Sequence, residues 1–93
     1  PATPAMSAAP AAAIAPAPAA TLPVEVCPVH HETVSGLVCS DCAFELKSAD
    51  TDQEQAAACW SAIRARLTRL QHEGVDTSGA WMANAQFANR RGL

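Results

Sequence analysis

Two short motifs, Cys27-x2-His30 and Cys39-x2-Cys42, constrain the fold of this chain more than any other feature. Eight residues separate the two motifs, and each motif holds two metal-ligating side chains. Two intervening residues form a tight turn that directs both ligand atoms at one point. Cys thiolates and a neutral imidazole are also the ligands that tetrahedral Zn²⁺ prefers. We therefore expect Cys27, His30, Cys39 and Cys42 to bind one zinc ion.

The expected ligand set leaves no coordination position open. A catalytic zinc keeps one position for water or substrate, so three cysteines and one histidine predict a structural metal. The sequence also has no nucleophile elbow, phosphate-binding loop or paired-carboxylate arrangement. We expect that the chain is not an enzyme.

Other assignments of these residues remain open at this point. His31 or Cys59 could replace His30 as the fourth ligand, although Cys59 lies on an apolar helical stripe and is expected to be a small buried residue. Four cysteines also allow three pairings of two disulfides in an exported protein, with Cys39 and Cys42 as a redox pair.

Three segments follow from the composition. Residues 1–23 carry no charge and hold six of the seven prolines, which predicts an extended Ala/Pro arm or flexible linker, with a partner-binding strap as the alternative. Residues 24–50 form the expected zinc-binding module, and residues 51–93 the expected helical hairpin. None of these segments has the long apolar run of a membrane-spanning helix.

Within residues 24–50, alternating Val24 and Val26 predict a short strand before the first ligand pair. Ser35-Gly36 suits a tight turn, which predicts a short β-hairpin between the two ligand pairs. Ser40 or Asp41 is expected to cap a helical turn after Cys42. The fold class predicted is a small zinc-stabilised α+β module.

Within residues 51–93, Thr51 and Glu54 have the spacing of a capping box, and Gly74 is placed to end the helix. A second helix is expected over residues 80–89. The first helix carries an apolar stripe, for which we expect a role in binding a partner protein: Trp60, Ile63, Leu67 and Leu70.

The order of ligand pair, hairpin and ligands at a helix start resembles treble-clef and zinc-ribbon modules. The span from Cys27 to Cys42 is also similar to the opening of a B-box zinc finger, Cys-x2-His followed by Cys-x2-Cys. The later ligands of the second B-box metal site are missing here, so neither the two-zinc fold nor the partners of B-box proteins are carried over to this chain.

The core is small for the chain length, since domains below roughly 80 residues commonly need a metal or a partner. We therefore expect a non-catalytic structural or adaptor subunit of a larger assembly, of respiratory, translation or virion type. A net charge of −3 makes nucleic acid an unlikely partner, yet a zinc-ribbon-like nucleic-acid or regulatory module using Arg64, Arg66 and Arg69 is an alternative. The N-terminus lacks the pattern of a secretion signal, which favours the cytoplasm or an assembly over secretion.

Overall fold

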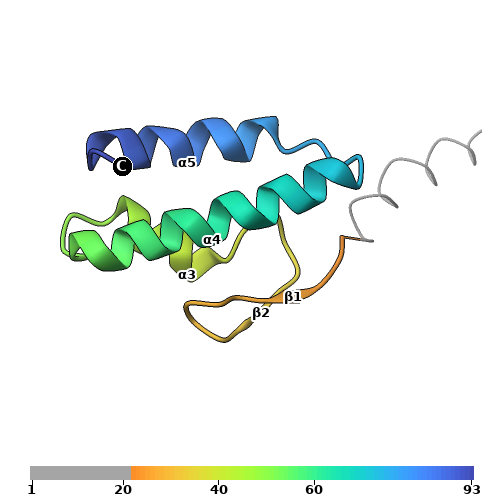
Figure 1. Cartoon of the computed structure of the whole chain (residues 1–93), viewed down its shortest axis with the longest axis horizontal. Helices are drawn as coiled ribbons and strands as arrows, with labels where there is room; N and C mark the ends of the chain where they lie inside the picture. Colours follow the sequence, from red (N-terminus) through yellow and green to blue (C-terminus); the bar gives the residue numbers. More distant parts are fainter. Residues whose placement is uncertain (1–21) are drawn as a thin grey trace, which may run out of the picture.

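The computed structural model describes residues 22–93, so all but the last two residues of the predicted Ala/Pro arm lie outside the described residues. The chain is a small α+β fold, as predicted, with a two-stranded antiparallel sheet followed by helices (Figure 1). Its elements in chain order are β1 (Glu25–Val26), β2 (Thr33–Val34), α3 (Ser40–Lys47), α4 (Gln53–His72) and α5 (Ser78–Arg90). Among the helices of residues 22–93, none combines the length and the apolar composition that crossing a bilayer requires.

The hairpin lies earlier in the chain than predicted. Glu25 pairs with Val34 and Val26 with Thr33, so the first ligand pair sits inside the turn of the hairpin and not before it. The Cys27 amide donates to the Glu32 carbonyl at 2.8 Å and closes this turn. The tight turn that we expected at Ser35-Gly36 does not join the strands, and within the observed turn His31 has a positive φ of 58°.

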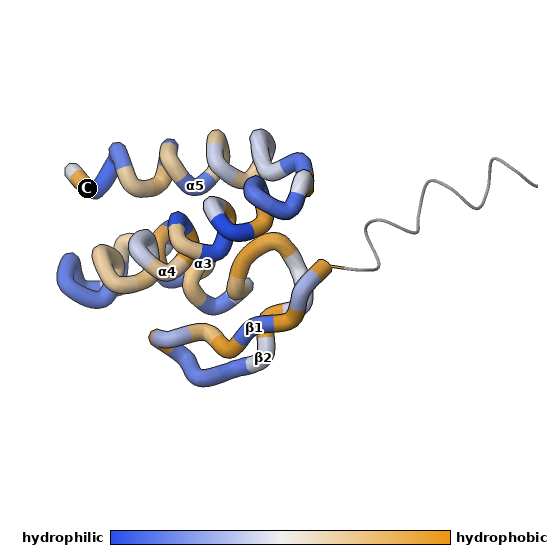
Figure 2. Tube along the Cα trace, turned by 45° about the vertical axis from the view of Figure 1, so that its right-hand side comes forward, coloured by the Kyte–Doolittle hydropathy of each residue, from blue (hydrophilic) through white to orange (hydrophobic). Residues whose placement is uncertain are grey.

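Helix α3 begins directly at the second ligand pair. Cys39 is its N-cap residue and makes no side-chain capping hydrogen bond, so the predicted cap at Ser40 or Asp41 is wrong. The helix buries Cys42 and Leu46 on one face and packs with that face against α4 and α5. The segment joining β2 to α3 becomes hydrophobic as it approaches α3 (Figure 2), and its Leu37 and Val38 pack against the core.

Helix α4 starts one residue later than the predicted capping box implies. Its cap is Asp52, whose Oδ1 accepts a hydrogen bond from the Gln55 amide at 2.7 Å. The predicted stop at Gly74 is confirmed: Gly74 has a φ of 88°, and the Val75 amide donates to the Leu70 carbonyl at 3.0 Å. This bond and the left-handed residue are the features of a Schellman motif.

Two glycine-to-alanine substitutions test whether backbone conformation, rather than the space for a Cβ, determines the effect on the free energy of unfolding. A Cβ at Gly74 or Gly79 would meet no atom within 4 Å, but only Gly74 has a positive φ. We expect Gly74→Ala to lower the free energy of unfolding by about 1–2 kcal/mol, and Gly79→Ala, inside α5, to raise it by about 0.5 kcal/mol. Urea denaturation of both variants tests this, and equal shifts would contradict it.

Helix α5 runs back along α4, so the two form the predicted helical hairpin (Figure 1). The rings of Trp60 and Trp81 meet edge to face between them, with centroids 6.2 Å apart and planes at 88°. The largest fully buried side chains come from α3 and α4: Leu46, Ile63, Leu67, Leu70, Cys42 and Cys59.

This core corrects the expected partner-binding surface. Ile63, Leu67 and Leu70 are at most 1% exposed, because α3 and α5 pack along α4. Cys27 and Val34 of the hairpin join the same core cluster as Ile63 and Leu67. Only Trp60 is partly exposed. An amphipathic stripe indicates that a helix face is covered, and in this fold the chain itself covers it.

Candidate metal centre

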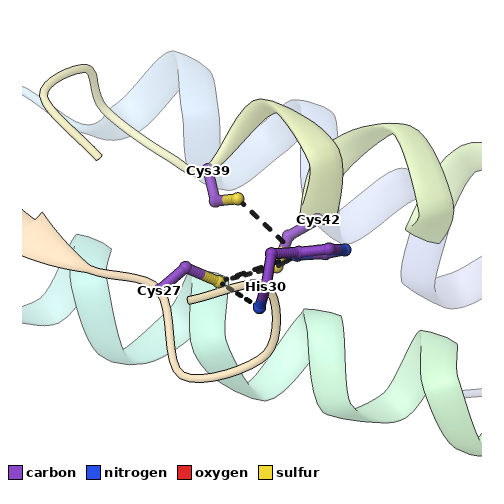
Figure 3. Close-up of side chains that lie close together, drawn as sticks. All are labelled: Cys27, His30, Cys39 and Cys42. Carbon is purple, nitrogen blue, oxygen red and sulfur yellow. Dashed lines mark hydrogen bonds between the residues drawn. The ribbon is translucent and has the colours of Figure 1, made fainter. Parts of the chain in front are cut away.

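The four predicted ligands come together at one point, from two structural elements (Figure 3). Cys27 and His30 belong to the turn of the β-hairpin, while Cys39 and Cys42 lie at the start of α3. Their ligand atoms, three Sγ and one imidazole nitrogen, all lie within 4.8 Å of one another. The site therefore joins the hairpin to the helical part of the fold.

The separations between ligand atoms fit a single tetrahedral metal ion. The Sγ atoms of Cys27 and Cys42 are 3.5 Å apart. The Nδ1 atom of His30 lies 3.4 Å from Cys42 Sγ, 3.7 Å from Cys27 Sγ and 3.8 Å from Cys39 Sγ. With Zn–S bonds of 2.3 Å and a Zn–N bond near 2.0 Å, a tetrahedron has S···S edges of about 3.8 Å and S···N edges of about 3.5 Å.

The hairpin turn also supports the charge of a thiolate. The backbone amides of Val29 and His30 each point at Cys27 Sγ, at 3.4 Å. Burial opposes ionisation of this thiol, yet the hydrogen bond from the His30 amide, the contact with the His30 imidazole and the hydrogen bond from the Val29 amide prevail and lower the pKa of Cys27 to about 7. One ligand is therefore prepared for the deprotonated form that binds a metal.

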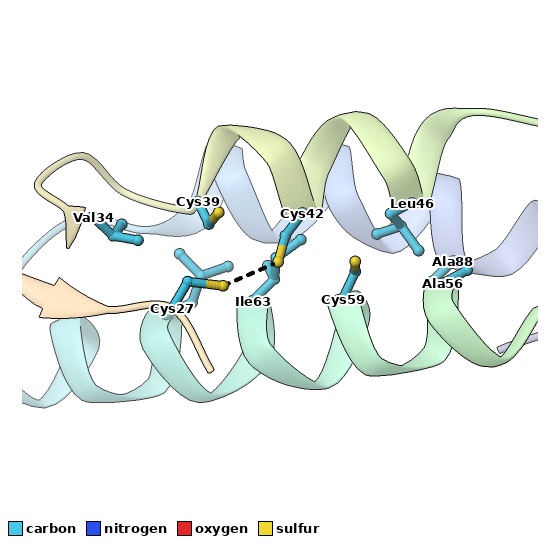
Figure 4. Close-up of a cluster of buried hydrophobic side chains, with 10 residues drawn as sticks. Cys27, Val34, Cys39, Cys42, Leu46, Ala56, Cys59, Ile63 and Ala88 are labelled. Atoms are coloured by element: carbon cyan, nitrogen blue, oxygen red, sulfur yellow. Dashed lines mark hydrogen bonds between the residues drawn. The ribbon is translucent and has the colours of Figure 1, made fainter. Parts of the chain in front are cut away.

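The other two sulfurs are continuous with the hydrophobic core (Figure 4). Burial raises the pKa of the Cys39 thiol and of the Cys42 thiol, so neither would ionise readily without a nearby positive charge. A bound divalent cation supplies that charge and deprotonates coordinating thiols. All four cysteines of the chain carry free thiols, and none is in a disulfide.

The remaining nitrogen of the His30 ring is also engaged. Nε2 donates to Glu45 Oε2 at 3.0 Å. Glu45 Oε1 accepts from Gln55 Nε2 at 2.8 Å and from the Cys59 thiol at 3.5 Å. The Glu45 carboxylate raises the pKa of His30, and the hydrogen bonds from Gln55 and then His30 lower the pKa of Glu45.

The geometry favours His30 as the fourth ligand of this cluster. His30 turns its Nδ1 toward the three sulfurs. Cys59 is fully buried against Glu45 and falls in a second, three-residue group with His30 and Glu45, not in the group of four. Burial raises the pKa of the Cys59 thiol to about 11, as suits a small core residue. His31 is exposed and is not among the clustered ligand atoms of residues 22–93.

Sequence reasoning missed the structural role of Arg66, which anchors β1 and the segment before α3 to α4. Its side chain is only 5% exposed and donates from Nη1 to Glu25 at 2.9 Å. Its Nε and Nη2 donate to the Gly36 carbonyl at 3.2 and 2.6 Å. Arg69 also forms an ion pair with Glu25. The signal was present in the spacing, since Arg66 follows Ile63 by three residues and so shares the apolar face.

Comparison of the chain with protein-family models, with curated proteins and with solved structures finds no match in any of the three.

Proposed function

We propose that this chain is a small module stabilised by one structural zinc ion, and that it acts as a non-catalytic structural or adaptor subunit of a larger protein assembly. The observation that carries the proposal is the closed set of four ligands, Cys27, His30, Cys39 and Cys42, at tetrahedral separations. Four protein ligands leave no position for a substrate or a reactive water, which is the arrangement of structural zinc sites.

The position of the site supports a role in folding. The two strands contain two residues each, and an isolated two-stranded hairpin is marginally stable at best. A metal bound by Cys27 and His30 on one side and by Cys39 and Cys42 on the other would fix this hairpin to α3. Zinc-binding free energy would then contribute directly to folding.

The adaptor role is supported by apolar side chains that the described residues leave uncovered. Val24, Val26, Phe44 and Met82 are each 63–68% exposed. Contact with another protein would remove this apolar area from water. A respiratory, translation-type or virion assembly would accommodate such a subunit, located in the cytoplasm or within the assembly.

The two alternatives have less support. In a nucleic-acid module Arg64, Arg66 and Arg69 would be free for phosphates, but Arg66 and Arg69 already pair with Glu25. In an exported disulfide protein the cysteines would be paired, whereas here three thiols converge on one histidine nitrogen. No observation favours either alternative.

Elemental analysis of protein purified without chelators, with a thiol count after denaturation, tests the metal. We expect one zinc per chain and four titratable thiols. We also expect a strong chelator to unfold residues 24–47 and lower the temperature of the thermal transition, and added zinc to restore both, because metal binding is coupled to folding. Absence of both metal and free thiols would instead indicate two disulfides.

The native mass of the protein in its own extract tests the adaptor role. We expect the chain to migrate with other proteins at a mass well above its own 9.6 kDa. Recovery of all of it as a folded, zinc-containing monomer would contradict this part of the proposal and leave the metal site intact.

A further inference from the structure

Glu45 connects the metal centre to a helix that supplies none of its ligands. The carboxylate lies on α3, one turn after Cys42, and its two oxygens face different elements. Oε2 meets His30 Nε2 at 3.0 Å, and Oε1 meets Gln55 Nε2 of α4 at 2.8 Å. Cys59, also on α4, approaches Oε1 at 3.5 Å.

The contact with His30 determines how that ring can bind a metal. A neutral imidazole carries one proton, and the nitrogen without it has the lone pair for coordination. A carboxylate only accepts hydrogen bonds, so Glu45 holds the proton at Nε2 and leaves the lone pair at Nδ1. Nδ1 is the atom that lies among the three sulfurs.

The contacts with α4 limit the movement of Glu45 itself. A glutamate side chain has several rotatable bonds, and an unrestrained one would lose conformational entropy each time it oriented the ring. Hydrogen bonds from Gln55 and Cys59 hold Oε1, so the carboxylate is already oriented when His30 meets it. Gln55 is in turn fixed near the capped start of α4.

We propose that Glu45 is the outer-sphere positioning residue of the metal centre, and that the chain His30–Glu45–Gln55 transmits metal binding to α4. This inference rests on the proposed zinc site. Outer-sphere partners orient ligands and raise their basicity, and their loss typically costs about ten- to a hundredfold in metal affinity.

The experiment measures Co²⁺ and Zn²⁺ affinity of the full chain by competition with a chromophoric chelator. We compare wild type with Glu45→Ala, Glu45→Gln and the control Glu54→Gln, which removes an exposed carboxylate from the first turn of α4. We expect affinity to fall about a hundredfold in Glu45→Ala and about tenfold in Glu45→Gln, whose amide oxygen still accepts from Nε2. The control is expected to match wild type.

Two spectroscopic readouts distinguish positioning from a general effect on folding. The Co²⁺ charge-transfer bands of all variants are expected to keep the intensity of three thiolates, because the cysteines are untouched. The ¹⁵N signals of the His30 ring are expected to show one tautomer in wild type and a mixture in Glu45→Ala. Weaker binding with an unaltered His30 ring signal would overturn the proposal.

The zinc site and the positioning role of Glu45 are contradicted by different results. A wild-type chain that binds neither Co²⁺ nor Zn²⁺ would contradict the proposed structural zinc itself. Tight binding by wild type together with equal affinity in Glu45→Ala would overturn the role of Glu45 alone. Gln55→Ala tests the α4 end of the His30–Glu45–Gln55 hydrogen-bond series. We expect metal affinity to fall about three- to tenfold in this variant, and unchanged affinity would show that α4 takes no part.

Discussion

Cys42→Ser is expected to abolish zinc binding and to unfold residues 24–47. Cys42 is fully buried, and its Sγ lies within 3.5 Å of both Cys27 Sγ and His30 Nδ1. The zinc-binding free energy of structural sites in small peptides is about 10–16 kcal/mol. The free energy of unfolding of a whole domain is roughly 5–15 kcal/mol, so loss of the metal removes a comparable amount. Zinc stoichiometry and amide hydrogen exchange over the hairpin and α3 would report the loss.

The matched control is Cys59→Ser, which makes the same substitution at the other fully buried cysteine near the site. Cys59 is not one of the four clustered ligands, and a serine hydroxyl can still donate to Glu45. We expect this variant to keep one zinc per chain and to lose about 1–2 kcal/mol of stability. Equal metal loss in both variants would show that the ligand set is wrongly assigned.

Arg66→Ala is expected to destabilise the zinc-bound protein by about 2–3 kcal/mol. The substitution removes the donors for the Gly36 carbonyl and one partner of Glu25. Breaking a fully buried pair costs about 3–5 kcal/mol, but here the cost is smaller because Glu25 is 23% exposed and keeps Arg69. Guanidinium denaturation at saturating zinc measures it.

Arg64→Ala provides the control on the same helix. Arg64 is exposed, and its guanidinium carbon lies 5.8 Å from the centre of the Trp60 ring. We expect a loss of about 0.5–1 kcal/mol, as for an exposed cation–π contact. If the two arginine variants unfold at the same midpoint, Arg66 does not anchor β1 and the segment before α3 in the way its hydrogen bonds indicate.

The convergence of Cys27, His30, Cys39 and Cys42 was predictable because its signal is local. Cys-x2-His and Cys-x2-Cys fix which side chains converge within each turn, whatever surrounds them. The stop of α4 at Gly74 was predictable for the same reason, since only one residue needs the left-handed conformation. The choice of His30 over His31 also followed from spacing, and the geometry supports it.

Other features depend on contacts between distant residues, and the sequence pattern did not specify them. The hairpin closes around Cys27 and His30 because Glu25–Val26 pairs with Thr33–Val34, whereas Ser35-Gly36 offered an equally good local turn. The sequence pattern showed that Ile63, Leu67 and Leu70 would be covered, but not whether α3 and α5 or another protein would cover them. The role of Glu45 required α3, α4 and the hairpin turn to be placed relative to one another.

The edge-to-face tryptophan pair makes the unfolding of this chain optically readable. Trp60 and Trp81 are its two tryptophans and it has no tyrosine, so the near-ultraviolet signal arises chiefly where α4 meets α5. The metal centre lies on the α3 side of α4 and adds no aromatic ring other than His30. Fluorescence and circular dichroism of the indoles would thus follow the helical hairpin alone, while Co²⁺ absorption follows the thiolate site. Recording both signals during denaturation would then distinguish unfolding of the metal site alone from unfolding of the whole molecule.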